Sequence, residues 1–189
     1  MEAVILVEPQ IPENTGFIAR LCSNYNAEMR IVNSEFNLSE SRDTAANAQN
    51  VLDEAEIFEK LENAVEDLDF VVGTKPGCGT GLQNFQPRSN TSLVLGREDS
   101  GLSNEELEIC DAVVHIDTPG YSSMNLSHAA AVLMHEFAEE SEGENIGGRS
   151  EYLKDLVGDN IISELILRGS PTEKEFDRLI GELQRFKNS

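Results

Sequence analysis

The stretch LVLGREDSGLSNEE, residues 93–106, contains the kind of unit from which we predict the whole fold. The apolar run Ser92–Leu95 is typical of a strand, and Gly96 after it permits a tight backbone or the close approach of a ligand. A helix is expected over Ser103–Cys110, because Ser103 and Glu106 have the spacing of a capping box. This stretch is therefore predicted to be one strand–turn–helix unit of an α/β protein.

Short apolar runs alternate with longer amphipathic runs over the first 140 residues. Further strands are predicted at Ala3–Val7, Met29–Val32, Asp69–Thr74 and Ala112–Asp117, and helices at Glu13–Tyr25, Leu52–Leu68 and Asn125–Glu139. Such alternation indicates a mostly parallel α/β sheet flanked by helices on both faces. Ligands of these sheets bind beyond the carboxyl ends of the strands, so the loops there are the candidate site.

The composition changes near residue 141. Residues 141–150 are rich in Gly, Glu and Ser and are predicted to be a linker, which separates a domain of residues 1–140 from an extension of residues 151–189. The extension is expected to be helical, and its last helix has start signals at Ser170, Pro171 and Glu173. Periodicity leaves open whether these helices pack on their own domain or on a partner subunit.

The chain is strongly acidic, with 35 Asp and Glu residues against 14 Lys and Arg residues and a formal net charge of −21. RNA affinity comes largely from Lys and Arg that neutralise phosphates, so this charge favours an acidic interaction module over a nucleic-acid-binding protein. The acidic residues are nevertheless dispersed along the whole chain, and only five lysines are present. In molar salt the Debye length falls to about 3 Å, which screens repulsion of RNA. We interpret the composition as adaptation to high salt, as in a halophilic archaeon.

Several classes of site are disfavoured by the sequence. The three cysteines, Cys22, Cys78 and Cys110, are widely spaced, which argues against a disulfide framework or a zinc site and fits a reducing compartment. No apolar stretch reaches the 18 residues of a transmembrane helix, and the flanks of a signal peptide are missing. We expect a cytoplasmic protein with neither a membrane segment nor a metal.

Three short segments could carry chemistry: Asn14–Arg20, Gly96–Glu98 and Ser123–Ser127. Each has a plain structural interpretation, namely a solvated arginine, a surface ion pair and the N-cap of a helix. Functionally, amides at a helix N-terminus with small polar side chains form a pocket for a polar ligand. Asn14 and Arg20 would both point toward the sheet edge, where an arginine is uncommon unless it is paired or functional. Local patterns leave both interpretations open.

Three motifs in register carry a family resemblance: EPQIPENTGFIAR at residues 8–20, the stretch at residues 93–106, and YSSMNLSHA at residues 121–129. In order and separation they resemble the motifs of SPOUT RNA methyltransferases, in particular the SpoU branch and its TrmJ-like tRNA members. The resemblance implies a domain whose C-terminal part is tied in a deep trefoil knot. It also implies a homodimer with active sites at the subunit interface, and S-adenosylmethionine as cofactor.

The resemblance assigns roles to individual residues. The cofactor would be held by three loops, which contribute Thr74, Lys75, Pro76, Gly96, Arg97, Ile116, Ser122, Ser123, Met124 and Asn125. The ribose hydroxyl would be activated and positioned by Arg20, Asn14, Glu98, Ser123 and Asn125. A guanidinium is effectively always charged, so Arg20 fits an orienting cation better than a base. Lys75 and Pro76 depart from the small residues usual in such relatives, and Asp117 stands where many have proline.

The implied activity is 2′-O-methylation of RNA, with the ribose at position 32 of the tRNA anticodon loop as the suggested target. Within the same fold, ribosomal RNA is the alternative substrate. From another class, a non-catalytic RNA-binding or scaffold protein stays open. Basic side chains near the presumed site that could contact RNA are Arg20, Arg42, Lys75, Arg88 and Arg97.

Overall fold

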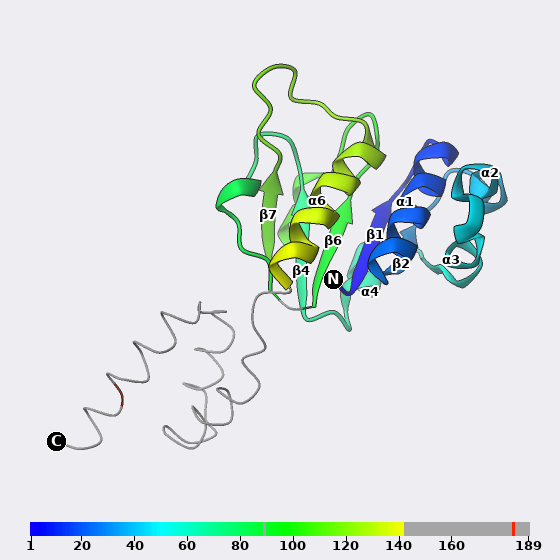
Figure 1. The fold of residues 1–189 in the computed structure, drawn as a ribbon, viewed down its shortest axis with the longest axis horizontal. Helices are drawn as coiled ribbons and strands as arrows, with labels where there is room; N and C mark the ends of the chain where they lie inside the picture. Colours follow the sequence, from blue (N-terminus) through cyan, green and yellow to red (C-terminus); the bar gives the residue numbers. More distant parts are fainter. Residues whose placement is uncertain (89, 142–182, 184–189) are drawn as a thin grey trace. The chain divides into compact units, whose positions relative to one another are not determined.

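The structure, a computed structural model, describes residues 1–88, 90–141 and 183. A seven-stranded sheet lies within residues 3–115. All its paired strands are parallel, in the order β3-β2-β1-β6-β4-β7-β5 (Figure 1). The strands are β1 (Ala3–Val7), β2 (Glu28–Val32), β3 (Glu56–Phe58), β4 (Phe70–Thr74), β5 (Thr80–Gly81), β6 (Thr91–Leu95) and β7 (Ala112–His115).

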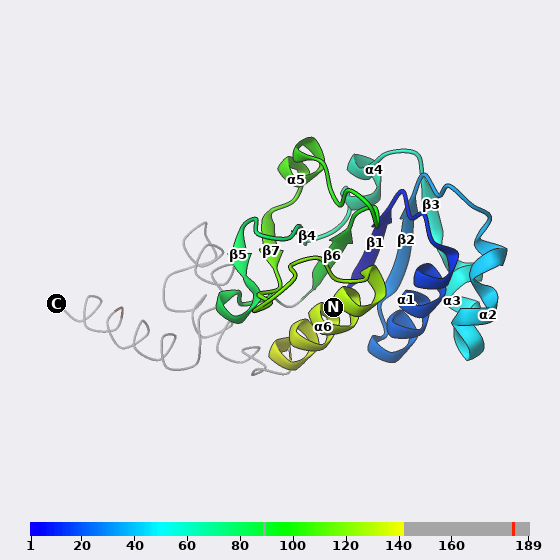
Figure 2. The ribbon, with the colours of Figure 1, turned by 90° about the horizontal axis from the view of Figure 1, so that it is seen from above.

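Helices cover both faces of the sheet. They are α1 (Pro12–Tyr25), α2 (Arg42–Ala45), α3 (Gln49–Glu54), α4 (Leu61–Val65), α5 (Asn104–Ile109) and α6 (Leu126–Ser141), with 3-10 turns η1 (Leu38–Ser41), η2 (Ala46–Ala48) and η3 (Leu82–Asn84). Figure 2 shows α1 and α6 on one side of the sheet and α4 and α5 on the other. None of the described helices is long and apolar enough to cross a membrane.

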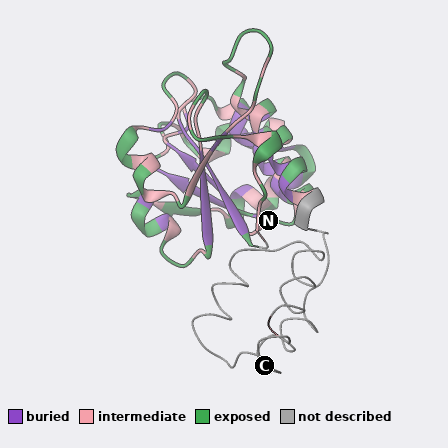
Figure 3. Cartoon of the chain, turned by 90° about the vertical axis from the view of Figure 1, so that its left-hand side faces the viewer, coloured by how far each residue is buried: buried purple, intermediate pink, exposed green. Residues whose placement is uncertain are grey.

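The central strands are apolar on both sides because both faces are covered. In β1, Val4 and Leu6 pack into the core on the α1 and α6 side, whereas Ile5 and Val7 pack into the core under α4 and Leu102. The buried strands lie at the centre of the unit formed by residues 1–141 (Figure 3). The predicted α/β class with a mostly parallel sheet is therefore confirmed. Most predicted element boundaries differ from the structure by only a few residues.

The predicted helix Leu52–Leu68 is wrong. This segment forms α3, the strand β3 and α4 in succession, and β3 pairs in parallel with the neighbouring strand β2. Its apolar residues have helical spacing, but the backbone hydrogen bonds available at the open edge of β2 decide for a strand. Residues 75–90, where no strand or helix was predicted, contain the short strand β5, which pairs with β7.

The domain boundaries predicted for residues 141–150 and 151–189 fall almost wholly outside the described residues. Residues 1–141 form one compact unit. Within it, Cys22 is buried in the core, and burial raises the pKa of its thiol to about 12.

A buried guanidinium links strand β2 to the segment after α4. Arg30 is only 5% exposed, and its Nη1 donates to Asp67 Oδ1 at 2.6 Å and to the carbonyl of Ala64 at 2.8 Å. Its Nη2 also donates to Asp67 Oδ2, at 2.9 Å. The hydrogen bonds from Arg30 lower the pKa of Asp67 to about 2.

Replacing Asp67 by asparagine is expected to lower the free energy of unfolding at neutral pH, because Arg30 then stays buried without its main counter-charge. A lowered pKa means that the folded state favours the ionised carboxylate. The contribution of the ionised Asp67 carboxylate to the free energy of unfolding is therefore complete above pH 4 and is lost as the pH falls through about 2. Urea unfolding from pH 7 to pH 2 should show the free energies of unfolding of wild type and Asp67→Asn converging at the acid end.

Glu66→Gln, a substitution at an exposed neighbouring residue, is the control. An equal loss of stability in that variant would contradict the assignment.

Candidate active site

A pocket of about 260 Å³ opens where the adjacent strands β6, β4 and β7 end. Parallel strands bring their carboxyl ends to one edge, so the loops that follow Leu95, Thr74 and His115 meet there. The floor is apolar and includes Leu95, Val114 and Leu133. The rim is polar and is formed by the three loops.

Most residues predicted to hold the cofactor line this pocket. They are Thr74, Lys75, Pro76, Gly96, Arg97, Ile116, Ser122, Ser123 and Met124, together with Glu98 from the predicted catalytic set. Asn125 lies outside the lining. Sequence reasoning missed His115, Asp99 and Ser100, which also line the pocket. The position of His115 at the end of β7, and those of Asp99 and Ser100 inside the motif of residues 93–106, were the available signal.

Gly96 sits where the backbone of its own loop turns back on itself. The amide of Gly101 donates to the carbonyl of Arg97 at 2.9 Å, which closes a tight turn. A Cβ at Gly96 would lie 2.3 Å from the carbonyl carbon of Gly101 and from the amide nitrogen of Leu102. Only glycine therefore fits at this end of β6.

A Gly96→Ala variant is expected to lose about 1–3 kcal/mol of stability, since the added methyl group meets backbone that cannot rotate away. Gly120→Ala is the matched control in the same region, because a Cβ there meets nothing within 4 Å. Urea unfolding of both variants measures the difference. Equal stability of Gly96→Ala and wild type would show that the turn opens freely.

Arg97 lines the pocket, but its guanidinium is bound within the protein. Its Nε donates to Glu8 Oε2 at 2.6 Å, and its two terminal nitrogens donate to Glu106 at 3.0 and 2.9 Å. Glu106, then Glu8, raise the pKa of Arg97. Burial opposes ionisation of Glu106, yet the hydrogen bonds from Arg97 and from the amide of Ser103 outweigh it and lower its pKa. Arg97 thus ties the end of β1 and helix α5 to the pocket loop.

The capping box predicted from the sequence is present at α5. Ser103 Oγ accepts from the amide of Glu106, and Glu106 accepts from the amide of Ser103. Lys75 fastens the same segment from the β4 side, because its Nζ donates to the carbonyl of Leu102 at 2.9 Å. The loop between β6 and α5 is therefore held from both neighbouring strands.

Three predicted catalytic residues form one chain of hydrogen bonds. Asn125 Nδ2 donates to Asn14 Oδ1 at 3.0 Å, and Asn14 Nδ2 donates to Glu98 Oε1 at 3.1 Å. Asn125 Oδ1 also accepts from the amide and hydroxyl of Ser127, which is the capping role expected of it. The structure thus joins the three motifs through these side chains, and Asn14 is buried between the other two.

Glu98 caps helix α1 from a distant part of the chain. Helix α1 has no side-chain cap of its own at Ile11. Glu98 Oε2 accepts from the amide of Gln10 at 2.9 Å, and Glu98 Oε1 accepts from the amide of Ile11 at 3.3 Å. A carboxylate at a helix N-terminus is stabilised both by the amides and by the helix dipole. The N-terminal turn of α1 is therefore fixed to the pocket.

Arg20 and Ser123 are not part of this chain. Ser123 is exposed and lies on the pocket rim. Arg20 is exposed on α1, away from the pocket lining, and no hydrogen bond or ion pair joins its side chain to another described residue. The expectation that Asn14 and Arg20 both point toward the sheet edge is wrong for Arg20. Six residues on a helix correspond to 600°, which leaves the two side chains about 120° apart around its axis.

Among known protein families, residues 1–135 match the SpoU rRNA Methylase family. This chain belongs to that family. The chain is also similar to the tRNA (cytidine-2'-O-)-methyltransferase TrmJ of Methanocaldococcus jannaschii, to which it is 38% identical over 154 residues. The match covers 72% of this chain and 66% of that protein, so the chain spans just under two thirds of its relative's length.

Solved structures show the SpoU fold as well. A structure determined for work on the 2-OH methylation of C/U34 on tRNA has a TM-score of 0.70 at 22% identity, and the match covers 76% of this chain and 98% of that chain. The SpoU methyltransferase AviRb from Streptomyces viridochromogenes, in complex with the cofactor AdoMet, has a TM-score of 0.67 at 21% identity. That match covers 76% of this chain and 61% of AviRb. At such identities the likeness shows the shared fold.

Proposed function

We propose that this chain is an S-adenosylmethionine-dependent tRNA 2′-O-methyltransferase, with the ribose at position 32 of the anticodon loop as its target. The observation that carries the proposal is the glycine-lined pocket at Gly96, built by three strand-end loops in a chain of the SpoU family. The relative from M. jannaschii methylates tRNA cytidine at the 2′-oxygen, as its name states. We expect the protein in the cytoplasm, together with its proposed substrate.

The residues present fit the proposed cofactor. The pocket combines an apolar floor with a polar rim, and the absence of a side chain at Gly96 lets the backbone of residues 96–102 fold tightly along one side of it. AviRb binds AdoMet on the same fold. When bound, S-adenosylmethionine supplies an electrophilic methyl group on its sulfonium. We assign Thr74, Gly96, Ile116 and Met124 to holding it through backbone and side-chain contacts.

The chain's own task is to orient and activate a poor nucleophile. A ribose hydroxyl must be aligned with the methyl group and must lose its proton during transfer. We assign Arg20 to orienting the hydroxyl and stabilising its developing negative charge, since a guanidinium stays protonated. We place Ser123 beside the ribose, and we assign Asn14, Glu98 and Asn125 to fixing α1 relative to the pocket.

We further propose a homodimer in which Arg20 of one subunit serves the pocket of the other. Arg20 is exposed and free of described partners in a single subunit. Two apolar side chains are exposed on the same helical layer, Phe17 of α1 (42%) and Val132 of α6 (37%). A second copy packed on this layer would cover them.

Three finer expectations belong to the same proposal. A deep trefoil knot is supported by the path of the chain, which leaves β7 near one sheet edge and returns to α6 against β6 and α1. The linker at residues 141–150 and the helical extension at residues 151–189 follow from the sequence. Adaptation to high salt follows from the dispersed acidic composition.

The test is a methyl-transfer assay in high salt with unmodified tRNA and ribosomal RNA transcripts and labelled S-adenosylmethionine. Methylation of a single tRNA ribose is expected, and mapping the modified nucleotide identifies it. Transfer to ribosomal RNA alone would establish the alternative substrate, which the family's description favours. Calorimetry with S-adenosylmethionine separates both outcomes from a non-catalytic RNA-binding or scaffold protein. No detectable cofactor binding would overturn the enzymatic proposal.

A further inference from the structure

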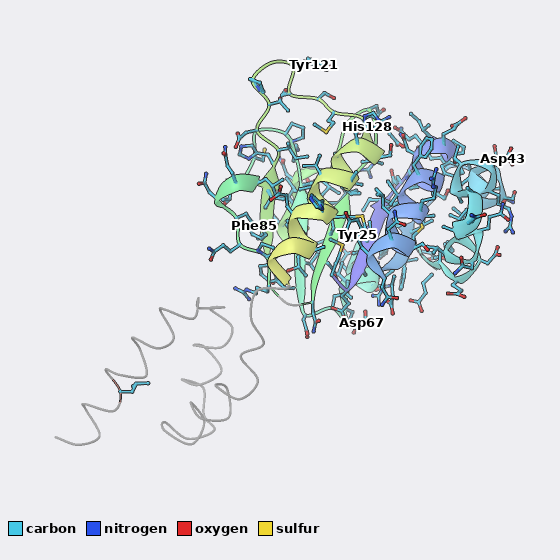
Figure 4. The ribbon with its side chains drawn as sticks, in the orientation of Figure 1. Tyr25, Asp43, Asp67, Phe85, Tyr121 and His128 are labelled. Carbon is cyan, nitrogen blue, oxygen red and sulfur yellow. The ribbon has the colours of Figure 1, made fainter. Side chains whose placement is uncertain are left out.

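An exposed aromatic side chain lies on a loop whose neighbouring residues line the pocket. Tyr121 lies in the loop between β7 and α6, and its exposed fraction of 85% is the largest of the exposed large hydrophobic side chains in the described part of the chain. Figure 4 shows it on the outermost part of this loop, pointing away from the sheet. Its backbone carbonyl accepts from Thr118 Oγ1 at 3.0 Å, but no described residue hydrogen-bonds its phenol or stacks on its ring.

The position of Tyr121 is set by residues that line the pocket. Thr118 lies three residues before it, and Ser122, Ser123 and Met124 follow it directly; all four line the pocket. A nucleotide whose ribose enters this pocket must leave its base near the same loop. Under the proposed function we expect the base to lie within reach of the exposed Tyr121 ring.

The described basic side chains offer few contacts for RNA phosphates. Arg30, Arg42 and Arg97 are held by carboxylates. Lys75 is bound to a carbonyl, and Arg88 lies over the ring of Phe70 at 4.1 Å. Of the Lys and Arg residues in the described ranges, only Arg20 and Lys60 have no carboxylate, carbonyl or aromatic ring as a partner. The predicted RNA-contacting cluster is thus largely occupied within the protein.

We propose that Tyr121 binds RNA by stacking on the base of the nucleotide that is methylated. Base–aromatic stacking needs no phosphate contact and tolerates any base, because every base has a π-face. Screening by salt weakens phosphate contacts but leaves stacking largely intact. In a chain with a net charge of −21, stacking contributes the RNA affinity that lysine and arginine contribute in other RNA-binding proteins. This inference rests on the proposed methyltransferase function.

A fluorescence experiment tests the contact directly. The chain contains no tryptophan, so a Tyr121→Trp variant carries a single indole as reporter. With S-adenosylhomocysteine bound, an unmodified tRNA transcript is expected to quench this indole in molar salt. The same transcript made abasic at the mapped target nucleotide should quench it far less. Equal quenching by the two transcripts would overturn the proposal.

Kinetics supply a second readout. Tyr121→Leu keeps an apolar side chain but removes the ring, and it should raise KM for tRNA by about 5- to 100-fold. Its kcat and its affinity for S-adenosylhomocysteine should change little, and the conservative Tyr121→Phe should restore KM. Ile57→Ala is the distant control, because Ile57 is exposed on the edge strand β3. A fall in kcat at unchanged KM would assign Tyr121 to the chemical step and overturn stacking as its role.

Two outcomes separate this inference from the function on which it rests. If wild type methylates tRNA and Tyr121→Leu does so with unchanged KM, only the stacking proposal fails. If wild type binds no cofactor and methylates no RNA, the proposed function fails first. A changed oligomeric state of Tyr121→Leu in gel filtration would show that a second copy of the chain covers the ring, and would overturn RNA as its occupant.

Discussion

Replacing Arg20 with alanine is expected to slow methyl transfer about 100- to 1,000-fold, the effect typical of removing one donor that stabilises developing charge. The affinity for S-adenosylmethionine should stay nearly unchanged, because Arg20 is assigned to the ribose hydroxyl and is not among the residues assigned to hold the cofactor. Arg20→Lys keeps the charge but loses the planar fork, so it should recover only part of the rate. Single-turnover assays and calorimetry measure the two effects separately. A fully active Arg20→Ala variant would remove Arg20 from the mechanism.

Arg20→Ala also tests the proposed homodimer when it is combined with a second variant, Gly96→Val. Gly96→Val places a bulkier side chain against the backbone of Gly101 and Leu102 and should displace the loop that lines the pocket. Neither variant alone should transfer methyl groups at a normal rate. In a mixed dimer, the intact pocket of the Arg20→Ala subunit would face the intact Arg20 of the Gly96→Val subunit. Refolding the two variants together after partial unfolding should therefore restore activity. If mixing restores nothing while both variants form dimers, each Arg20 serves its own subunit or none.

Glu98→Gln is the second change from which we expect a large effect. The carboxylate accepts three hydrogen bonds, from the amides of Gln10 and Ile11 and from Asn14. Glutamine turns one acceptor into a donor and removes the charge. Leaving such a group unsatisfied costs about 1–3 kcal/mol, so the free energy of unfolding should fall by that amount. Methyl transfer should fall further, since α1 then loses its attachment to the pocket.

Glu13→Gln is the matched control for Glu98→Gln. Glu13 lies exposed in the first turn of α1 and does not cap the helix through its side chain. Glu13→Gln therefore removes the same charge from the same helix end without removing a hydrogen bond. Loss of this charge should cost at most about 0.3–1 kcal/mol, and less in high salt. Urea unfolding and initial rates of both variants should therefore separate hydrogen bonding from helix-dipole effects. Similar behaviour of the two would show that Glu98 acts only through its charge.

Local patterns predicted the parts of this protein that depend on near neighbours in the chain. The strands β1, β4 and β6 follow from apolar runs, and the capping box of α5 follows from the spacing of Ser103 and Glu106. The segment Leu52–Leu68 was mispredicted because its spacing fits a helix, whereas pairing with β2 is a contact between distant parts of the chain. Propensity is a weak guide where an open strand edge is available.

The candidate site likewise has features that local sequence predicted and features that depend on contacts between distant parts of the chain. The sequence by itself determined the parallel α/β class, the three motifs and the loops that line the pocket, because strand ends and glycines are local features. Only the tertiary structure decided that Glu98 caps α1, that Arg97 is bound to Glu8 and Glu106, and that Arg20 is left free on the surface. Glu98 and Gln10 lie 88 residues apart in the chain, and no periodicity reports such a contact. They meet because parallel pairing of β1 with β6 brings the ends of both strands to one edge of the sheet.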